Sequence, residues 1–136
     1  MEFTAEKRVR FNEDTQTMEV DFSDLQMRSA ADVDAIYDAV QTALTQSSHE
    51  QWYFLINYKN CDIAMSARPA HSRRGSRMNF AHSLGSVRYD ANKAMREQIS
   101  QRPNSGDGSA NFYSSREDAV AEIASMQKRD PDARSH

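Results

Sequence analysis

The segment from Trp52 to Tyr58, with the sequence WYFLINY, constrains the fold more than any other part of the chain. Neighbouring side chains of a strand point to opposite faces, so one face of this segment carries Trp, Phe, Ile and Tyr and the other carries Tyr and Leu. A strand that is apolar on both faces lies inside a sheet that is covered on both sides. Asn57 interrupts the second face, and we expect its amide to tie down a neighbouring loop. The segment therefore predicts the central strand of a helix-backed sheet.

Two segments before this strand predict an antiparallel hairpin. Residues 3–12 (FTAEKRVRFN) are interpreted as a strand with Val9 and Phe11 on one side, and residues 17–24 (TMEVDFSD) alternate strictly between apolar and polar residues. The polar stretch NEDTQT between them is short enough for a hairpin connection. We expect one face of this hairpin to pack on the core and the other to contact water.

A helix is predicted from about Ala30 to Gln46, because Ser29 offers an N-cap oxygen and Asp32 follows as a capping-box partner. The apolar residues at helical spacing in this segment are Val33, Ile36, Tyr37, Val40 and Leu44.

A second helix is predicted around residues 71–83 (HSRRGSRMNFAHS), which hold three arginines and no acidic residue. Pro69 is tolerated only in a first turn, so we expect this helix to begin near Ser66 or Ala67. Helical projection places two sets of residues on different sides, an inward set of Ala67, His71, Gly75, Met78 and His82 and an outward set of Arg73, Arg77 and Phe80. Glycine costs about 1 kcal/mol in a helix interior, which indicates that Gly75 closely approaches the sheet.

The rest of the chain continues the alternation of strands and helices. SLGSVRYD is extended, Asp90 is a predicted cap for a short helix, RPNSGDGSAN is a loop, NFYS is a strand, and Ser115 with Asp118 caps a last helix. The order β-β-α-β-α-β-α-β-α predicts an α/β fold with a single-layer mixed sheet, an opening hairpin and β-α crossovers. We expect one domain over residues 1–127 and a charged flexible tail over residues 128–136.

The composition favours a cytoplasmic protein without a membrane span. No apolar window is long enough for a bilayer, the N-terminus lacks a signal-peptide pattern, and the single Cys61 has no partner for an intrachain disulfide. The net charge of -3 is unevenly distributed: residues 1–50 carry four Lys or Arg against eleven Asp or Glu, and residues 51–110 carry nine against four. This asymmetry either attracts an acidic partner to the middle third or, as we favour, holds the parts of one fold together.

The sequence contains no pattern for catalysis, a metal or a cofactor. No nucleophile elbow is present, the four histidines lack ligand spacing, and a calcium loop starting at Asp107 would put Phe112 where glycine is required. We interpret Cys61 as an inert buried thiol. We expect His71 and His82 to pack beside the sheet. Arg68, Arg73, Arg74 and Arg77 do not indicate nucleic-acid binding, since the chain is acidic overall and offers no clear stacking platform.

The opening hairpin with TMEVDFSD, the strand WYFLINY followed by KNCDIA, the strand LGSVRY and the final helix SREDAVAEIASM together resemble the STAS-like group, the small α/β domains of anti-sigma-factor antagonists, and their Sec14-like relatives. The phosphorylation-switched members carry an aspartate, a serine and a glycine after the buried strand. This chain keeps Asp62 but lacks the serine-glycine pair, so a modification at this turn would fall on Cys61 or Ser66.

The resemblance implies a non-enzymatic regulatory module that docks a protein partner with an acidic surface in bacterial cytoplasmic signalling. The residues expected at the binding surface are Asn60, Cys61, Asp62, Ser66, Arg68, Arg73 and Arg77. Two alternatives stay open. One is a domain that binds a small anionic ligand, such as a nucleotide or a lipid headgroup, near the helix start at Arg68. The other is an enzyme, which would need a deep polar cleft that the sequence does not show. A homodimer is also compatible with the sequence.

Overall fold

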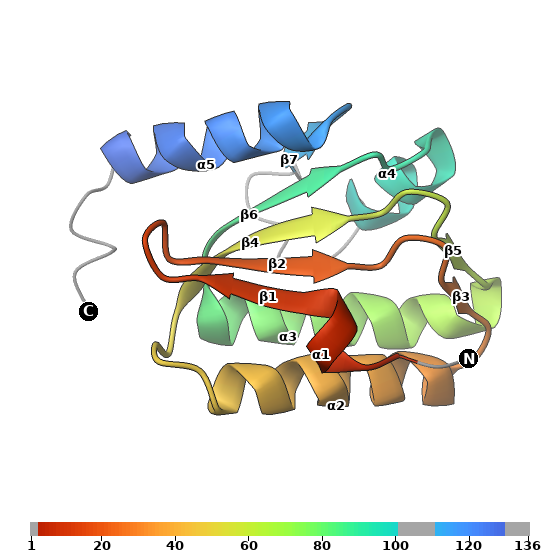
Figure 1. The fold of residues 1–136 in the computed structure, drawn as a ribbon. Coiled ribbons are helices and arrows are strands. Elements are labelled where there is room, and N and C mark those ends of the chain that lie inside the picture. Colours follow the sequence, from red (N-terminus) through yellow and green to blue (C-terminus); the bar gives the residue numbers. More distant parts are fainter. Residues whose placement is uncertain (1–2, 101–110, 130–136) are drawn as a thin grey trace.

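A computed structural model describes residues 3–100 and 111–129 of the chain. A five-stranded mixed sheet lies at its centre, with the strand order β1-β2-β4-β6-β7 (Figure 1). The strands are β1 (Val9–Asn12), β2 (Thr17–Asp21), β4 (Trp52–Asn57), β6 (Ser83–Tyr89) and β7 (Asn111–Tyr113). Only the β1–β2 pair is antiparallel, and the other neighbours are parallel. The predicted α/β fold with an opening hairpin and a mixed sheet is therefore confirmed.

Five helices accompany the sheet in the described part of the chain. They are α1 (Ala5–Arg8), α2 (Ala30–Thr45), α3 (Arg68–His82), α4 (Lys93–Ser100) and α5 (Arg116–Arg129). The sequence places a helix in every parallel connection because each connection contains apolar residues at helical spacing. Along the chain, the five strands of the main sheet and helices α2 to α5 follow one another in the predicted order β-β-α-β-α-β-α-β-α.

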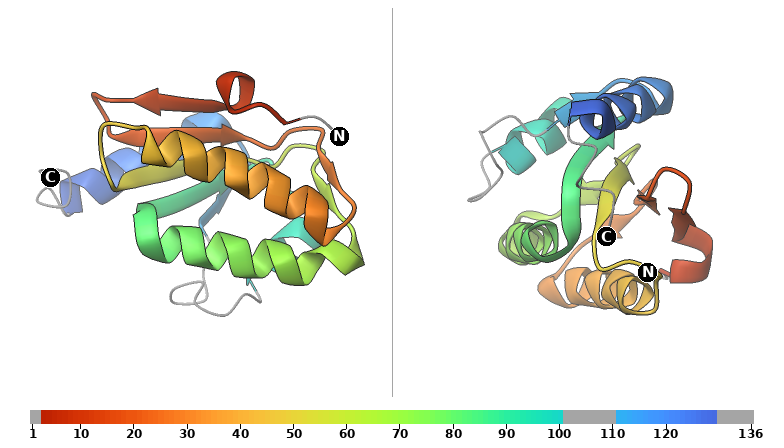
Figure 2. Two further views of the ribbon diagram at one scale, coloured as in Figure 1. Left: turned by 90° about the horizontal axis from the view of Figure 1, so that it is seen from below. Right: turned by 90° about the vertical axis from the view of Figure 1, so that its left-hand side faces the viewer.

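The crossover helices α2, α3 and α4 share one face of the sheet, and α5 lies against the other (Figure 2). Successive parallel strands are added in one direction across the sheet, and crossovers keep one hand, so the connecting helices fall on the same side. The final helix α5 follows the last strand and is free to cross to the second face. The two faces are therefore covered unequally.

The strand β4 is buried on both faces, as the sequence predicts. Trp52 is 0% exposed in the larger core beneath α2 and α3, and Tyr53 and Leu55 are each 1% exposed in the smaller core beneath α5. Asn57 acts as predicted, because its Oδ1 accepts a hydrogen bond from the Lys59 backbone N–H in the following loop at 2.9 Å. Burial of both faces makes β4 the element on which both cores depend.

Two predicted helix caps are confirmed. The Ser29 Oγ accepts from the Asp32 backbone N–H at 3.2 Å, and the Ser115 Oγ accepts from the Asp118 backbone N–H at 3.2 Å. The carboxylate of Asp32 reaches back one residue further than expected, since it accepts from the Arg28 backbone N–H at 2.9 Å.

The predicted cap of α4 at Asp90 is wrong. The Asn92 Oδ1 accepts from the Met95 backbone N–H at 2.8 Å and caps the helix instead. Asp90 adopts a left-handed backbone with φ of 59°, and its N–H donates to the Tyr113 carbonyl oxygen at 3.0 Å. Asparagine and aspartate are both good caps, so sequence spacing alone did not separate the two positions.

Three further elements differ from the sequence interpretation. Residues 5–8 form the short helix α1 rather than strand, because the AEKR run consists of good helix formers without alternation. Residues 62 and 63, expected as a turn, form β5 (Asp62–Ile63), which pairs with β3 (Gln26–Met27) in a separate two-stranded sheet. Helix α5 extends through Lys128 and Arg129, where the tail was expected to begin, and residues 130–136 and the predicted loop up to residue 110 lie outside the described residues.

An ion pair fixes the start of α5 to β2. Arg116 donates from Nε and Nη2 to the two carboxylate oxygens of Glu19, each at 2.8 Å, and the Tyr89 hydroxyl donates to Glu19 Oε2 at 3.0 Å. The hydrogen bonds from Arg116 lower the pKa of Glu19 below its usual value, despite the opposing effect of burial. Folding therefore favours the ionised carboxylate.

Replacing Glu19 tests this attachment through its dependence on pH. We expect Glu19→Gln to lower the free energy of unfolding by about 1 kcal/mol at neutral pH, because part of the pair is screened by water. The contribution is complete above the pKa of an unfolded glutamate, about 4.3, and is lost as pH falls through the lower pKa of the folded state. Urea denaturation at about pH 7 and pH 3 should show the difference from wild type shrinking in acid. Glu97→Gln, exposed on α4, is the matched control, and a pH-independent deficit for Glu19→Gln would contradict the assignment.

A glycine allows α5 to approach the sheet closely. A Cβ atom built on Gly85 in β6 would lie 2.9 Å from the Met126 sulfur and 3.4 Å from the Tyr53 ring. Real Cβ atoms do not approach so closely, so any larger residue at position 85 must displace the Met126 side chain. Gly75, in contrast, lines a cavity of about 20 Å³ between α3 and the sheet, so the predicted close approach of Gly75 to the sheet is wrong.

Enlarging residue 85 should loosen α5. We expect Gly85→Val to destabilise the protein by about 1–3 kcal/mol through overpacking, and Gly85→Ala to cost less because the flexible Met126 side chain can move. Met126→Ala should restore part of the loss in Gly85→Val. A double-mutant cycle from chemical denaturation measures this coupling, and strictly additive effects would show that the two residues do not compete for space.

Candidate functional site

The loops at the carboxyl ends of β2, β4 and β6 join into one surface. The Asp24 backbone N–H donates to the Lys59 carbonyl oxygen at 2.9 Å, and the Asn60 Nδ2 donates to the Asp24 Oδ1 at 3.2 Å. The Tyr58 backbone N–H donates to the Tyr89 carbonyl oxygen at 3.0 Å. The carboxyl edge of a parallel sheet is where α/β proteins usually hold their functional residues.

One residue in each of these loops has a left-handed backbone. Asp24, Asn60 and Asp90 have φ of 61°, 55° and 59°. Aspartate and asparagine tolerate this conformation better than other non-glycine residues, although it still costs about 1 kcal/mol or more per residue. Strained residues cluster at functional sites in many proteins, so the alignment of three of them makes this edge the candidate site.

The structure places the residues predicted at the turn in different environments. Asn60 and Asp62 are exposed, whereas Cys61 is buried at 2% exposure. The Asp62 backbone N–H donates to the Leu25 carbonyl oxygen at 2.9 Å within the β3–β5 pairing. The Ser66 Oγ donates to the Arg28 carbonyl oxygen at 3.0 Å. The turn after β4 is therefore fastened along its length to the loop between β2 and α2.

Helix α3 carries the predicted arginines, but not on one face. Arg73, Arg77 and Phe80 follow one another at helical spacing on the exposed side, and Phe80 is 91% exposed. We call these three residues the α3 outer face. Arg68 is also exposed at the start of the helix, but at 3.6 residues per turn it points about 140° away from Arg73. The predicted outward set is confirmed. Arg68 lies at the first residue of α3 and is not part of the α3 outer face.

The remaining arginine of α3 joins two helices. Arg74 donates from Nη1 to Asp34 at 3.1 Å and from Nη2 to Asp38 at 2.8 Å, both on α2. This contact supports the interpretation that the charge asymmetry holds the fold together. The contact between Arg74 and α2 leaves the α3 outer face uninvolved. Arg73 and Arg77 form no ion pair with any residue that the structure describes. No acidic residue occurs between residues 63 and 89.

The two histidines near α3 pack beside the sheet, as expected. His71 is 1% exposed and its Nε2 lies 3.4 Å from the Tyr58 hydroxyl. His82 is half-buried, with Nδ1 2.8 Å from the Glu50 carbonyl oxygen and Nε2 3.2 Å from the Gln41 amide nitrogen.

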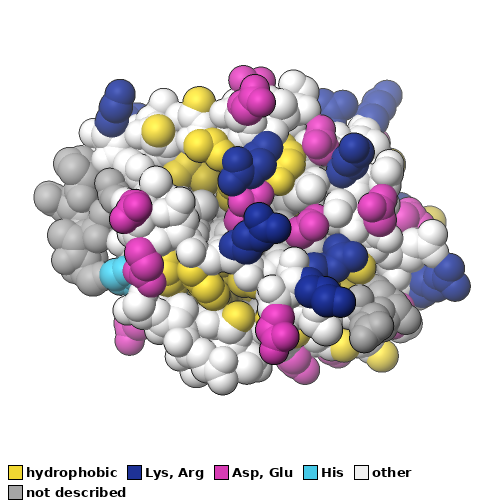
Figure 3. All heavy atoms as spheres, viewed as in Figure 1, with side chains coloured by type: hydrophobic (Ala, Val, Ile, Leu, Met, Phe, Trp, Pro, Cys, Tyr) yellow, Lys and Arg dark blue, Asp and Glu magenta, His cyan; other side chains and the backbone are white. Residues whose placement is uncertain are grey.

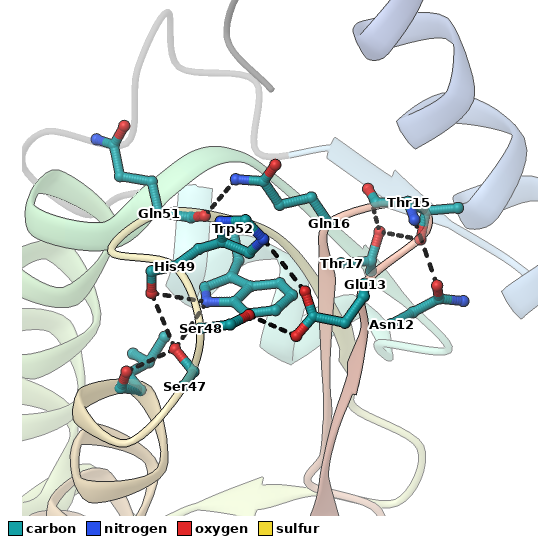
Figure 4. Close-up of polar contacts among 11 residues, drawn as sticks. Asn12, Glu13, Thr15, Gln16, Thr17, Ser47, Ser48, His49, Gln51 and Trp52 are labelled. Atoms are coloured by element: carbon teal, nitrogen blue, oxygen red, sulfur yellow. Dashed lines mark hydrogen bonds and ion pairs between the residues drawn. The ribbon is translucent and has the colours of Figure 1, made fainter. Parts of the chain in front are cut away.

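A polar cluster that sequence spacing did not reveal lies at the opposite edge of the sheet (Figure 4). The His49 Nε2 lies 3.2 Å from Glu13 Oε2 in the β1–β2 turn, and the Ser48 hydroxyl donates to the other oxygen of Glu13. The Trp52 Nε1 donates to the Ser47 Oγ at 3.0 Å. The cluster joins a turn and a loop separated by more than thirty residues, so no local pattern could predict it.

The order of groups in this cluster differs from that of a catalytic triad. In a triad the histidine lies between the serine and the carboxylate and takes the serine proton. Here the Glu13 carboxylate lies between Ser48 and His49 (Figure 4), and the Ser48 hydroxyl donates to the carboxylate rather than to the histidine. We therefore assign the cluster to fastening the hairpin turn against the start of β4.

Among residues 3–100 and 111–129, no group of three or more histidine, cysteine, aspartate or glutamate side chains is placed to hold a metal ion. Within the same residues, none of the helices has the length and apolar character needed to cross a bilayer. Comparison with known proteins gives no significant match to any protein-family model, curated protein or solved structure.

Cys61 should be unreactive in the folded protein. Burial raises the pKa of its thiol to about 12, so its thiolate fraction at pH 8 is about a thousandfold below that of an ordinary cysteine. We expect Ellman's reagent to label the native protein far more slowly than the protein in urea. Rapid stoichiometric labelling without denaturant would show that Cys61 is accessible and would reopen it as a modification site.

Proposed function

We propose that this protein is a non-enzymatic, STAS-like docking module that binds an acidic surface of a protein partner. The docking surface consists of the α3 outer face and the exposed residues Asn60 and Asp62 of the turn after β4, whereas Cys61 between them is buried. The observation that carries the proposal is the exposure of Phe80, at 91%, beside two arginines that no described carboxylate neutralises. Arginine and aromatic residues are enriched where binding energy concentrates in protein interfaces.

The arrangement of elements supports the STAS-like part of the proposal. A hairpin is followed by alternating strands and helices, and the five strands form one mixed sheet. After the buried strand β4, a turn at the carboxyl edge of the sheet precedes helix α3. The resemblance leads us to propose bacterial cytoplasmic signalling as the setting. The absence of the serine-glycine pair favours constitutive docking over a switch at this turn.

Charge reversal on α3 tests the docking surface. Wild type and Arg73→Glu/Arg77→Glu are used to capture partners from the source cell, and each captured protein is identified and then measured in purified form. We expect the double variant to lose at least about tenfold in affinity, and wild-type binding to weaken as salt rises. Phe80→Ser should weaken binding without changing its salt dependence.

Lys7→Glu/Lys128→Glu is the matched control, because it changes net charge equally at two exposed residues outside α3. An affinity that falls equally in this control would point to overall charge rather than to the α3 outer face. An unchanged partner list for Arg73→Glu/Arg77→Glu would contradict the proposal.

The alternative of a small anion at the start of α3 is tested separately. Arg68 is exposed there and the helix has no side-chain cap, but Pro69 supplies no N–H to the first turn. Thermal-shift measurements with nucleotides and acidic lipid headgroups should raise the melting temperature if such a site exists. No shift with any anion, together with intact partner binding, would remove this alternative.

A further inference from the structure

The second face of the sheet is only partly covered. Helix α5 packs on β4, β6 and β7, and no other helix of residues 3–100 and 111–129 lies over β1 and β2 on this side (Figures 1 and 2). A groove of about 650 Å³ runs between α5 and the β1–β2 hairpin. This volume lies in the range typical of small-molecule sites.

The two walls of the groove differ in chemistry. On the α5 side, Val120 is 41% exposed and lies beside Ile123 and Ala124, and the buried Leu55 contributes to the floor. The opposite wall carries polar side chains of the hairpin, Arg10 among them. Figure 3 looks onto this side of the molecule, where hydrophobic side chains gather around a central column of charged ones. The groove is therefore amphipathic across its width.

Most charged groups that line the groove are already paired. Each carboxylate oxygen of Glu19 accepts a hydrogen bond from Arg116, and the Glu13 carboxylate lies within ion-pair distance of His49. Arg10 faces Glu19 directly across the hairpin, and its charge is one of the causes that lower the pKa of Glu19, but its guanidinium forms no hydrogen bond or ion pair with a described residue. Arg10 is thus the lining cation that remains available to a ligand.

We propose that this groove binds a small amphipathic monocarboxylate, with the carboxylate on Arg10 and the apolar part along Val120 and Ala124. A guanidinium presents a planar fork that fits a carboxylate with two parallel hydrogen bonds. The nearby Glu13 and Glu19 carboxylates disfavour a doubly charged headgroup, because a second negative charge would add repulsion without a second free cation. This site lies on different elements from the α3 outer face and does not depend on partner docking.

Titration with three probes that share one tail tests the proposal. Octanoate, octanol and octyl phosphate are added to the isotope-labelled full chain at about pH 8, and backbone and methyl resonances are followed by NMR. We expect saturable shifts of Leu55, Val120 and Ile123 with octanoate. Octanol, which lacks the charge, and octyl phosphate, which is dianionic at this pH, should each bind at least about tenfold more weakly.

Two variants and a control locate the binding. Arg10→Gln should weaken octanoate binding at least about tenfold, and Val120→Ser, at an exposed helix position, should weaken octanoate and octanol alike. Arg73→Gln makes the same change on the α3 outer face and should leave octanoate binding intact. Dispersed spectra of each variant confirm folding.

The outcomes are decisive in either direction. Absent or non-saturable shifts, shifts confined to other parts of the chain, equal binding of octanol and octanoate, or no effect of Arg10→Gln would each overturn the assignment. None of these results bears on the proposed docking function, which is measured with the α3 variants and a protein partner.

Discussion

The helices that connect the parallel strands lie against one face of the sheet, because successive strands are added in one direction and crossovers keep one hand. The opposite face then depends on α5, which follows the last strand. One helix spans about two strand spacings, given a diameter of about 10 Å and a spacing of about 4.8 Å, so α5 reaches the three strands β4, β6 and β7 and leaves β1 and β2 uncovered. The complete burial of Tyr53 and Leu55 and the open groove over the hairpin are two results of this single constraint.

The sequence predicted the main architecture because its decisive signals are local. The double-sided pattern of Trp52–Asn57 identified the central strand, and Ser29 and Ser115 marked two helix starts through hydroxyls that act within one turn. The missed elements are those whose pairing is distant. The strand β5 is too short to show alternation and exists because it pairs with β3 across more than thirty residues.

The candidate site was less predictable than the fold for a related physical reason. A helical projection separates Arg73 and Arg77 from the core, but it does not show that Arg74, one residue away, is neutralised by two aspartates of α2. Likewise, the availability of Arg10 depends on Arg116, which lies more than a hundred residues later and occupies both oxygens of Glu19. Composition records the charges, whereas tertiary structure decides which of them remain unpaired.

The β3–β5 pairing has a consequence for motion at the carboxyl edge. Backbone hydrogen bonds from Asp62 to Leu25 and from Ala64 to Met27 fasten the turn after β4 to the segment that leads into α2. Such a pair opens as one cooperative unit, since breaking either bond exposes the other. Asn60 and Asp62 are therefore attached through this pairing to the segment that leads into α2, and the two segments share one local stability.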